Sequence, residues 1–399
     1  MASLEEISEL YDQYVQKTYG RADLLFVRGQ GTRLYDDKGR EYLDFASGIA
    51  VCSMGHCHPA VTRAIQEQAA TLVHTSNLYL NEWQGRLAQK LVGMGFDGAK
   101  CFFCNSGAEA NEAMIKLARK AGNEKGRNEI IVMEDSFHGR TLATLAATGR
   151  SKYRKGFQPD MPGFKFVPYN DLESLQNAVT EQTCAVMMEP VQGEGGIIPA
   201  DAEYLRAVRA LCDEKGLMLL FDEVQCGCGR TGEFYAWQLS GVRPDALSMA
   251  KALGNGYPIG CMIAAPAYAD VLTPGTHAST FGGTPLACAA ACAVLDTIKE
   301  EKILENVKER SAYLMKALAG FAEKYSFVTG VRGAGLMVGL VMDQSPAPVL
   351  ASLRAKGLIA LSAGETVLRL VPPLTVTQED CETAVRLIGE ALDEFSVQK

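Results

Sequence analysis

Residues 101–119 read CFFCNSGAEANEAMIKLAR and hold three structural signals in direct succession. A short apolar run of strand length comes first, and a tight turn of small polar residues follows it. A helix is then expected from about Ala108 to Lys120, because its apolar residues recur at spacings of three and four. A buried strand that turns directly into a helix is the repeating unit of α/β proteins.

The same alternation continues on both sides of this stretch. Further helical spacing is found at 59–73, 82–95 and 202–216, and short apolar runs are found at 129–135, 184–190, 217–223 and 246–251. This order indicates a mainly parallel sheet covered by helices on both faces, which is an α/β fold. We expect a large domain over residues 56–290 and a smaller α+β domain built from residues 1–55 and 291–399.

The charge pattern narrows the classes of partner. The formal net charge of the 399 residues is −8, with acidic and basic residues interspersed. No basic stripe indicates nucleic acid, and no basic amphipathic segment indicates a membrane surface. The acidic start lacks the features of a signal peptide, and no apolar run approaches the roughly 20 residues of a membrane span. We therefore expect a cytoplasmic protein.

Twelve cysteines leave a different class open, a cysteine-based redox or metal-binding protein. Cys101 and Cys104 have the spacing of a redox pair, and CSMGHCHP at 52–59 clusters cysteine with histidine. The first pair lies in an expected strand, where residues three apart point to opposite faces. The second cluster lacks another pair at the distance that a zinc finger needs. We expect reduced thiols and no bound metal.

Polar residues close nearly every apolar run of the expected sheet. They are Asn105 and Ser106, Glu134 and Asp135, Glu189, Asp222 and Glu223, and Lys251. In an open α/β sheet, ligands bind outside the carboxyl ends of the strands, so these side chains are expected along one edge. Lys251 is flanked by apolar residues, and a buried amine is usually paired, deprotonated or covalently used.

Four features together predict a binding site for pyridoxal 5′-phosphate. Lys251 offers the amine for a Schiff base, and Asp222 offers an acidic partner for the pyridinium nitrogen. Residues 106–108, at a helix N-terminus, form a cradle for the phosphate. The segment DSFHGRTL adds Phe137 as a flat face and Arg140 as a clamp for a carboxylate.

Seven motifs in order along the chain resemble those of the class III aminotransferases of fold type I. They are GHCHP, FFCNSGAEANEAMIKLAR, SFHGRTLAT, EPVQGEGGIIPA, FDEVQCGCGRTG, AKALGNGYPIG and STFGGTPLAC. The similarity runs from about residue 31 to about residue 376 and covers nearly all of the chain. It implies a large domain with a mainly parallel, seven-stranded sheet and a smaller domain formed by the N- and C-terminal segments.

The resemblance also implies a role for each matching residue at the cofactor. Lys251 would carry pyridoxal 5′-phosphate, and Asp222 would pair with its ring nitrogen. Gln225 would reach the 3-oxygen of the ring, which would lie between Val224 and Phe137. The phosphate would be bound by Ser106, Gly107, Ala108 and, from a neighbouring subunit, Thr280. A homodimer with shared active sites is therefore expected.

On the substrate side, the resemblance implies that Arg140 holds an α-carboxylate, with Ser279 nearby. Arg369 matches the arginine that holds 2-oxoglutarate. Glu194 matches the glutamate that pairs with this arginine when an ω-amino donor is bound. Because an unpaired buried arginine would be costly, this ion pair is expected to open only for a dicarboxylate.

The expected activity is transfer of an ω-amino group from a small-molecule donor to 2-oxoglutarate by a ping-pong mechanism. The QGEGG stretch and the compact chain favour acetylornithine as the donor. Ornithine, succinylornithine, 4-aminobutyrate and lysine-pathway donors remain open alternatives. The chain carries Asn255 where a glycine is common in the family, which leaves the fine substrate preference unsettled.

Overall fold

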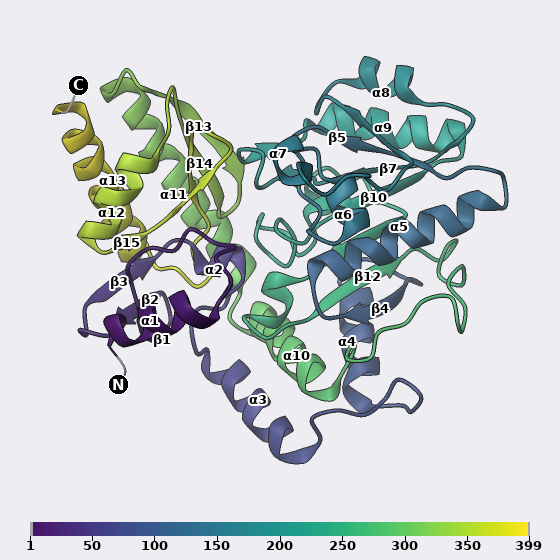
Figure 1. Ribbon diagram of the computed structural model, residues 1–399, viewed down its shortest axis with the longest axis horizontal. Coiled ribbons are helices and arrows are strands. Elements are labelled where there is room, and N and C mark those ends of the chain that lie inside the picture. The colour runs from purple at the N-terminus through teal and green to yellow at the C-terminus, as the bar shows by residue number, and fades with distance from the viewer. Residues whose placement is uncertain (1–2, 398–399) are drawn as a thin grey trace.

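A seven-stranded sheet in the order β4-β12-β11-β10-β7-β5-β6 forms the centre of the larger part of the molecule (Figure 1). The computed structural model describes residues 3–397. The strands of this sheet are β4 Lys100–Cys104, β5 Glu129–Met133, β6 Phe164–Val167, β7 Thr183–Met188, β10 Met218–Asp222, β11 Ala246–Met249 and β12 Gly260–Ala264. Strand β12 pairs antiparallel with both of its neighbours, and the remaining pairs are parallel. The predicted α/β fold with a mainly parallel, seven-stranded sheet is confirmed.

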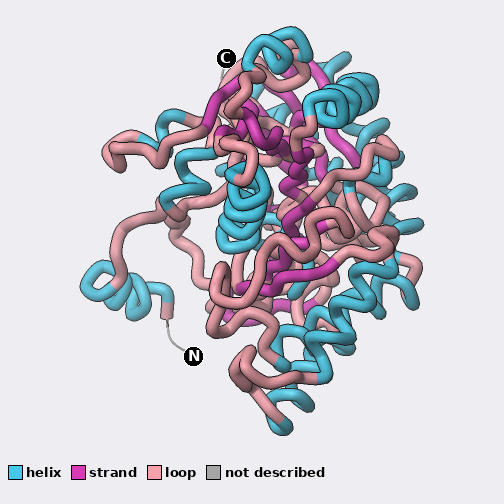
Figure 2. The backbone as a smooth tube through the Cα atoms, turned by 90° about the vertical axis from the view of Figure 1, so that its right-hand side faces the viewer, coloured by secondary structure: helices cyan, strands magenta, loops and turns pink. Residues whose placement is uncertain are grey.

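Helices cover both faces of the sheet because successive strand residues point to opposite sides. In β10, Leu220 packs in one apolar cluster with Met114 of α5, while Phe221 packs in the other cluster with Val208 of α9. Figure 2 shows the strands in the interior with helices around them. The helices of this part are α3 Pro59–Thr71, α4 Glu82–Gly93, α5 Gly107–Asn123, α6 Leu142–Ala147, α7 Ser151–Arg154, α8 Leu172–Ala178, α9 Ala202–Lys215 and α10 Pro285–Glu300.

The smaller part joins the two ends of the chain. Strand β3 Glu41–Asp44, near the N-terminus, pairs in parallel with β15 Leu358–Ile359. It continues the sheet formed by β1 Phe26–Gln30 and β2 Arg33–Asp36. A second sheet contains β13 Val328–Ala334, β14 Met337–Met342, β17 Val367–Leu370 and β16 Leu361–Ala363. The helices are α11 Ile303–Lys324, α12 Ala347–Lys356 and α13 Gln378–Val397.

The remaining elements are short or stand at the periphery. They are α1 Leu4–Tyr14, α2 Ser47–Ala50, the antiparallel pair β8 Val191–Gln192 and β9 Ile198–Pro199, and the 3₁₀ helices η1 Ala236–Leu239 and η2 Lys251–Gly254. None of the residues of α1 is buried. The domain boundaries at residues 55 and 290 stay a proposal, and α10 runs through the second of them. Within residues 3–397, no helix combines the length and apolar character needed to cross a membrane.

The stretch at 101–119 folds as its pattern predicts. The strand β4 ends at Cys104, and α5 begins at Gly107, one residue before the predicted start. The helix begins there because Ser106 is its N-cap, and the Ser106 hydroxyl accepts a hydrogen bond from the N–H of Glu109 at 3.2 Å. This turn places residues 106–108 at the carboxyl edge of the sheet.

Candidate active site

A cavity of about 380 Å³ lies at the carboxyl ends of β10 and β11. Asp222 is the last residue of β10, and Lys251 follows β11 by two residues. Most of the polar strand ends singled out in the sequence line this cavity. The lining residues are Val51, 105–108, Asn111, 137–140, Glu189, Glu194, Asp222, Val224, Gln225, Ala250, Lys251 and 256–259.

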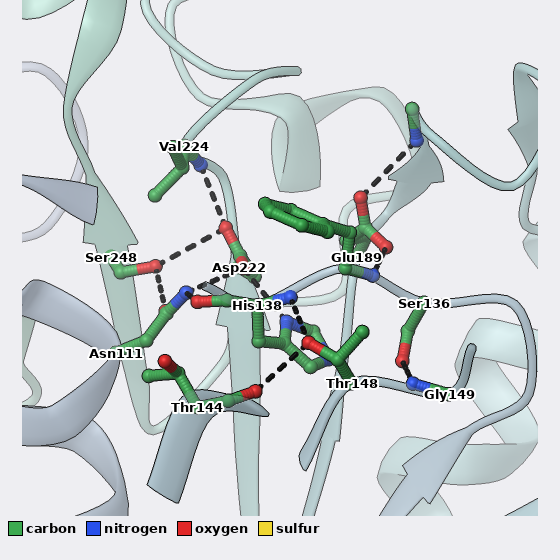
Figure 3. A network of polar contacts seen from close by, with 12 residues as sticks. Asn111, Ser136, His138, Thr144, Thr148, Gly149, Glu189, Asp222, Val224 and Ser248 are labelled. Carbon is green, nitrogen blue, oxygen red and sulfur yellow. Dashed lines mark hydrogen bonds and ion pairs between the residues drawn. The ribbon is translucent and has the colours of Figure 1, made fainter. Parts of the chain in front are cut away.

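Asp222 is the centre of a buried hydrogen-bond network (Figure 3). One carboxylate oxygen accepts hydrogen bonds from Asn111 Nδ2 at 2.7 Å and from the imidazole of His138 at 2.8 Å. The other oxygen accepts the N–H of Val224 at 3.0 Å and lies 3.4 Å from the hydroxyl of Ser248. Because both oxygens are held by donors, the carboxylate has a fixed position and a fixed charge at the cavity wall.

The residues that contact Asp222 are themselves fixed by further hydrogen bonds. The hydroxyl of Ser248 donates to Asn111 Oδ1 at 2.6 Å, and the backbone N–H of His138 donates to the Thr148 hydroxyl at 3.0 Å. Burial lowers the pKa of His138, but the hydrogen bond and charge of Asp222 outweigh it, so the net shift is upward. The hydrogen bond from His138 therefore holds the carboxylate of Asp222 in place at the cavity.

Lys251 has an unusual backbone conformation and a buried side-chain amine. Its φ angle is 46°, in the left-handed region that non-glycine residues rarely adopt. Burial lowers the pKa of its amine below the usual value, and the nearby charge of Glu194 opposes this shift only in part. Local strain and a depressed amine pKa are both typical of functional lysines.

The turn before α5 fits a phosphate group. Ser106, Gly107 and Ala108 line the cavity at the first turn of a 17-residue helix, where backbone N–H groups and the helix dipole favour an anion. A Cβ atom on Gly107 would lie 2.7 Å from Val224 Cγ1, which is closer than carbon atoms approach. Glycine therefore leaves room here that any other residue would fill.

Phe137 and Val224 border the same cavity, as a ring-binding pair requires. The N–H of Phe137 donates to Glu189 Oε2 at 3.1 Å, and the N–H of Gly193 donates to Oε1 at 3.1 Å. Burial raises the pKa of Glu189 above its usual range. Glu189 thus fixes the backbone that carries the aromatic ring.

The structure brings Arg369 and Glu194 together as an ion pair, although 175 residues separate them in sequence. The buried guanidinium of Arg369 also donates to Gln225 Oε1 at 3.2 Å. Burial acts to raise the pKa of Glu194, but the charge and hydrogen bond of Arg369 reverse this, so the net shift is downward. The pair is therefore ionised and closed in this structure.

Arg140 has a different setting from Arg369. It is exposed, and its guanidinium lies over the rings of Tyr153 at 4.2 Å and Phe137 at 5.5 Å. No carboxylate of the described residues forms an ion pair with it. An arginine held by aromatic faces and facing an open cavity is suited to bind a substrate carboxylate.

Two predicted site residues lie outside the cavity of a single chain. The hydroxyl of Ser279 accepts hydrogen bonds from Asn105 Nδ2 at 3.2 Å and from the N–H of Gly282 at 3.0 Å. Thr280 is exposed and does not border the cavity. The resemblance places Thr280 in the site of a neighbouring subunit, and this role stays a prediction.

Sequence reasoning missed three residues that hold Asp222. Asn111 lies four residues after Gly107, on the same face of α5, so helical spacing could have placed it at the cavity. Ser248 pairs directly with Asp222 across the parallel strands β10 and β11. His138 lies in the motif DSFHGRTL, but no local pattern indicates that it contacts a residue 84 positions later.

The structure describes all of the cysteines, including those of the segments 52–59 and 101–104. All twelve cysteines are free. Among residues 3–397, no group of three histidine, cysteine or acidic side chains is arranged to hold a metal ion.

Comparison with known proteins gives consistent matches over almost the whole chain. The family described as "Aminotransferase class-III" matches residues 14–392. The acetylornithine aminotransferase of Methanocaldococcus jannaschii is 48% identical, and the alignment covers 98% of this chain and 99% of that protein. The acetylornithine aminotransferase of Caldanaerobacter subterraneus is also 48% identical, with 96% and 98% covered. The crystal structure of ornithine aminotransferase from Toxoplasma gondii superposes with a TM-score of 0.95 at 32% identity, covering 100% of this chain and 97% of that one.

Proposed function

This chain belongs to the class III aminotransferases and is a pyridoxal 5′-phosphate-dependent enzyme, and we propose that its amino donor is N2-acetyl-L-ornithine. The δ-amino group would pass to 2-oxoglutarate, giving N-acetylglutamate 5-semialdehyde and glutamate. The observation that carries this proposal is the 48% identity, over nearly the full length, to two proteins named acetylornithine aminotransferase. This reaction would serve arginine biosynthesis.

The residues at the cavity fit the cofactor. When bound, pyridoxal 5′-phosphate supplies an electron sink for the electrons left by a departing proton. Asp222 would hold the ring nitrogen, which a fixed carboxylate keeps protonated. Gln225 would contact the 3-oxygen, and Phe137 and Val224 would enclose the ring. The phosphate would be held by Ser106, Gly107 and Ala108, with Thr280 of a second copy.

Lys251 would be both the attachment point of the cofactor and the base of the reaction. Because burial depresses the pKa of its amine, Nζ accepts a proton less tightly than an exposed lysine and is more often available as a base. Lys251 Nζ would take the proton from the donor's amino-bearing carbon and deliver it to the cofactor carbon. The left-handed backbone at Lys251 would fix the direction from which Nζ approaches.

Two arginines would serve two unlike substrates in one site. Arg140, with Ser279 nearby, would hold an α-carboxylate at the exposed side of the cavity. Arg369 would bind the dicarboxylate 2-oxoglutarate after its ion pair with Glu194 opens. With the uncharged acyl end of the donor bound, the Arg369–Glu194 pair would remain closed, because neither charge then has another partner.

We also propose a homodimer that shares its active sites. Apolar side chains beside Thr280 are exposed in the single chain, with 86% exposure at Leu78, 102% at Leu80 and 61% at Phe281. The side chain of Asn77 donates to the carbonyls of Ser279 at 3.0 Å and of Gly282 at 2.9 Å, so the two exposed segments form one surface. A contiguous exposed apolar surface is typical of a subunit interface. We place the enzyme in the cytoplasm, which its twelve free thiols support.

The experiment that tests the donor is a direct comparison of substrates. The purified protein would be given N-acetylornithine, N-succinylornithine, ornithine or 4-aminobutyrate with 2-oxoglutarate, and glutamate formation and the cofactor's visible absorption would be followed. We expect the highest kcat/KM for N-acetylornithine. A higher kcat/KM for ornithine, the donor named for the Toxoplasma gondii structure, would overturn the substrate and keep the family.

A further inference from the structure

Asn255 connects the turn that carries Lys251 to a segment 200 residues earlier in the chain. Its Oδ1 accepts the N–H of Met54 at 2.8 Å, and its Nδ2 donates to the carbonyl of Gly55 at 3.0 Å. Asn255 directly follows the 3₁₀ helix η2, whose first residue is Lys251. One side chain thus uses its donor and its acceptor on two successive backbone groups of the N-terminal part.

The segment that this asparagine binds, residues 53–56, is fixed by contacts of its own. Arg230 donates to the hydroxyl of Ser53 at 3.2 Å, and both of these side chains are fully buried. The imidazole of His56 lies 2.7 Å from the buried carboxylate of Asp44. The asparagine therefore ties the turn of the reactive lysine to a fixed support and not to a mobile loop.

The turn that carries Lys251 has a left-handed backbone at both of its ends. The φ angle is 46° at Lys251 and 46° at Asn255. At a lysine this conformation is unfavourable, and it persists only where the surroundings enforce it. The three residues in between are buried, and a Cβ atom on Gly254 would lie 2.8 Å from Ile259 Cγ2. Packing therefore fixes the middle of the turn, and the hydrogen bonds of Asn255 fix its end.

Asn255 lies between two parts of the cavity wall without bordering the cavity itself. Residues 256–259, which follow it, line the cavity, and so does Val51, three residues before Met54. Any effect of Asn255 on the reaction therefore has to pass through a neighbour, and the reactive neighbour is Lys251.

We propose that Asn255 is a positioning residue for proton transfer, because its two hydrogen bonds hold the turn from which Lys251 Nζ reaches the donor carbon and the cofactor carbon. This inference rests on the proton-carrying role proposed above for Lys251. With the donor amine in the site, the direction of Nζ depends on how firmly its own backbone is held. The glycine that is common here in the family provides neither hydrogen bond, so this tether is a property of this chain.

A simpler role for Asn255 would be to supply a left-handed backbone alone, which asparagine tolerates better than most residues. Glycine adopts that conformation more readily still. The two roles therefore predict opposite results for Asn255→Gly. A backbone role predicts an equally active enzyme, whereas a positioning role predicts slower proton transfer.

The test follows the first half-reaction of the holoenzyme, without 2-oxoglutarate, using the donor that gives the highest kcat/KM in the substrate comparison. Stopped-flow absorbance records the loss of the cofactor's visible band, with hydrogen or deuterium on the amino-bearing carbon of the donor. In Asn255→Gly we expect the limiting rate to fall about tenfold, with an unchanged half-saturating donor concentration. The deuterium effect should be at least as large as in the wild type. An unchanged rate, or a slower one with a smaller deuterium effect, would overturn the proposal.

A conservative variant and a matched control complete the kinetic test. Asn255→Asp keeps the acceptor for Met54 and loses only the donor, so its rate should lie between those of the wild type and Asn255→Gly, and a rate below that of Asn255→Gly would contradict the tether. The control is Asn170→Gly. Asn170 also has a left-handed φ, of 61°, and its side chain joins the N–H of Asp201 at 3.0 Å to the carbonyl of Pro199 at 3.3 Å, outside the cavity. It should leave the half-reaction unchanged, and an equal loss in both glycine variants would refute a specific role.

Hydrogen exchange of the holoenzyme gives a readout that does not depend on turnover. The N–H of Met54 is bonded to Asn255, so in Asn255→Gly we expect the peptides that cover residues 51–57 and 247–256 to exchange about tenfold faster than in the wild type. Unchanged protection of both peptides would show that Asn255 does not hold the turn, and would overturn the proposal. If every donor fails in the substrate comparison, the proposed function fails, and the exchange result still decides whether the tether exists.

Discussion

Two sides of the cavity differ in how completely the single chain builds them. The floor, formed by Asp222, Asn111, His138 and Ser248, is buried, and its side chains are hydrogen-bonded to one another. The other side has Arg140 at the cavity and Ser279, Thr280 and the adjoining apolar surface outside it; we call this side the mouth, and it is largely exposed.

The difference teaches which interactions must exist before binding. A charge that stabilises the cofactor ring works best when its position is fixed in advance, because no reorganisation is then needed during the reaction. A charge that binds successive substrates has to remain free between them. The floor is therefore organised by the chain alone, whereas the mouth would be completed by substrate and by the second copy that we propose.

The largest expected effect on activity comes from removing the amine of Lys251. Lys251→Ala should lower kcat by about 10³-fold or more, because the proton carrier is lost. The matched control is Lys120→Ala, on the exposed side of α5, which should leave kcat unchanged. Steady-state glutamate formation measures both. Retention of more than a tenth of the wild-type kcat would remove Lys251 from the proposed role.

A smaller effect on kcat is expected from removing the negative charge of Asp222. Asp222→Asn keeps the shape but removes the fixed charge, and we expect kcat to fall about 10²-fold. Asp213→Asn, at an exposed position on α9, is the control. If the variant lost cofactor affinity with an unchanged kcat at saturating cofactor, Asp222 would serve binding alone.

The proposed dimer interface beside the mouth can be weakened by substitution. Leu80→Ser combined with Phe281→Ser removes two exposed apolar side chains, and we expect the dimer dissociation constant to rise about tenfold or more. Sedimentation equilibrium measures the change, and activity should fall with the dimer fraction. Leu239→Ser, exposed elsewhere on the molecule, is the control. A wild-type protein that sediments as a monomer would refute the shared site.

The ion pair between Arg369 and Glu194 should have a moderate effect on the preference for ω- over α-amino donors. Glu194→Ala leaves Arg369 without its acidic partner, so the site should accept α-amino donors more readily. We expect the ratio of kcat/KM for ω- and α-amino donors to fall about tenfold. Glu203→Ala, exposed on α9, should not change the ratio. An unchanged ratio in Glu194→Ala would remove the idea of a charge switch.

The smallest expected effect is on the free energy of unfolding, and it comes from a buried carboxyl group beside the floor. Burial raises the pKa of Glu223, the residue after Asp222, to about 8, although the N–H groups of Ala236 and Trp237 oppose the shift. The folded state therefore holds this proton more tightly than the unfolded state. The free energy of unfolding should fall as pH rises from about 4.5 to about 8.

Denaturant unfolding at several pH values measures this dependence. Glu223→Gln cannot titrate, so its pH dependence over the same interval should be weaker than that of the wild type. Identical slopes in the two proteins would contradict the raised pKa of Glu223.

The sequence could identify Lys251 and Asp222 as the reactive residues but not the contacts that hold Asp222 in place. Lys251 and Asp222 each close an apolar run, and this local pattern was enough to place both at the carboxyl edge of the sheet. The contact between Asp222 and His138 spans 84 residues, and the one between Asp222 and Asn111 spans 111. Such contacts depend on which strands become neighbours, and strand order is not written in any short segment.

By itself, the sequence determined the alternation of strand, turn and helix, the parallel sheet, and the residue types at its edge. It did so because apolar periodicity, N-caps and glycine turns act within a few residues of one another. Only the tertiary structure decided that Asn111 and His138 meet at Asp222, that Asn255 joins two distant turns, and that His56 meets Asp44. These pairings form when distant segments pack, because burial then requires each charge and donor to find a partner wherever the fold places one.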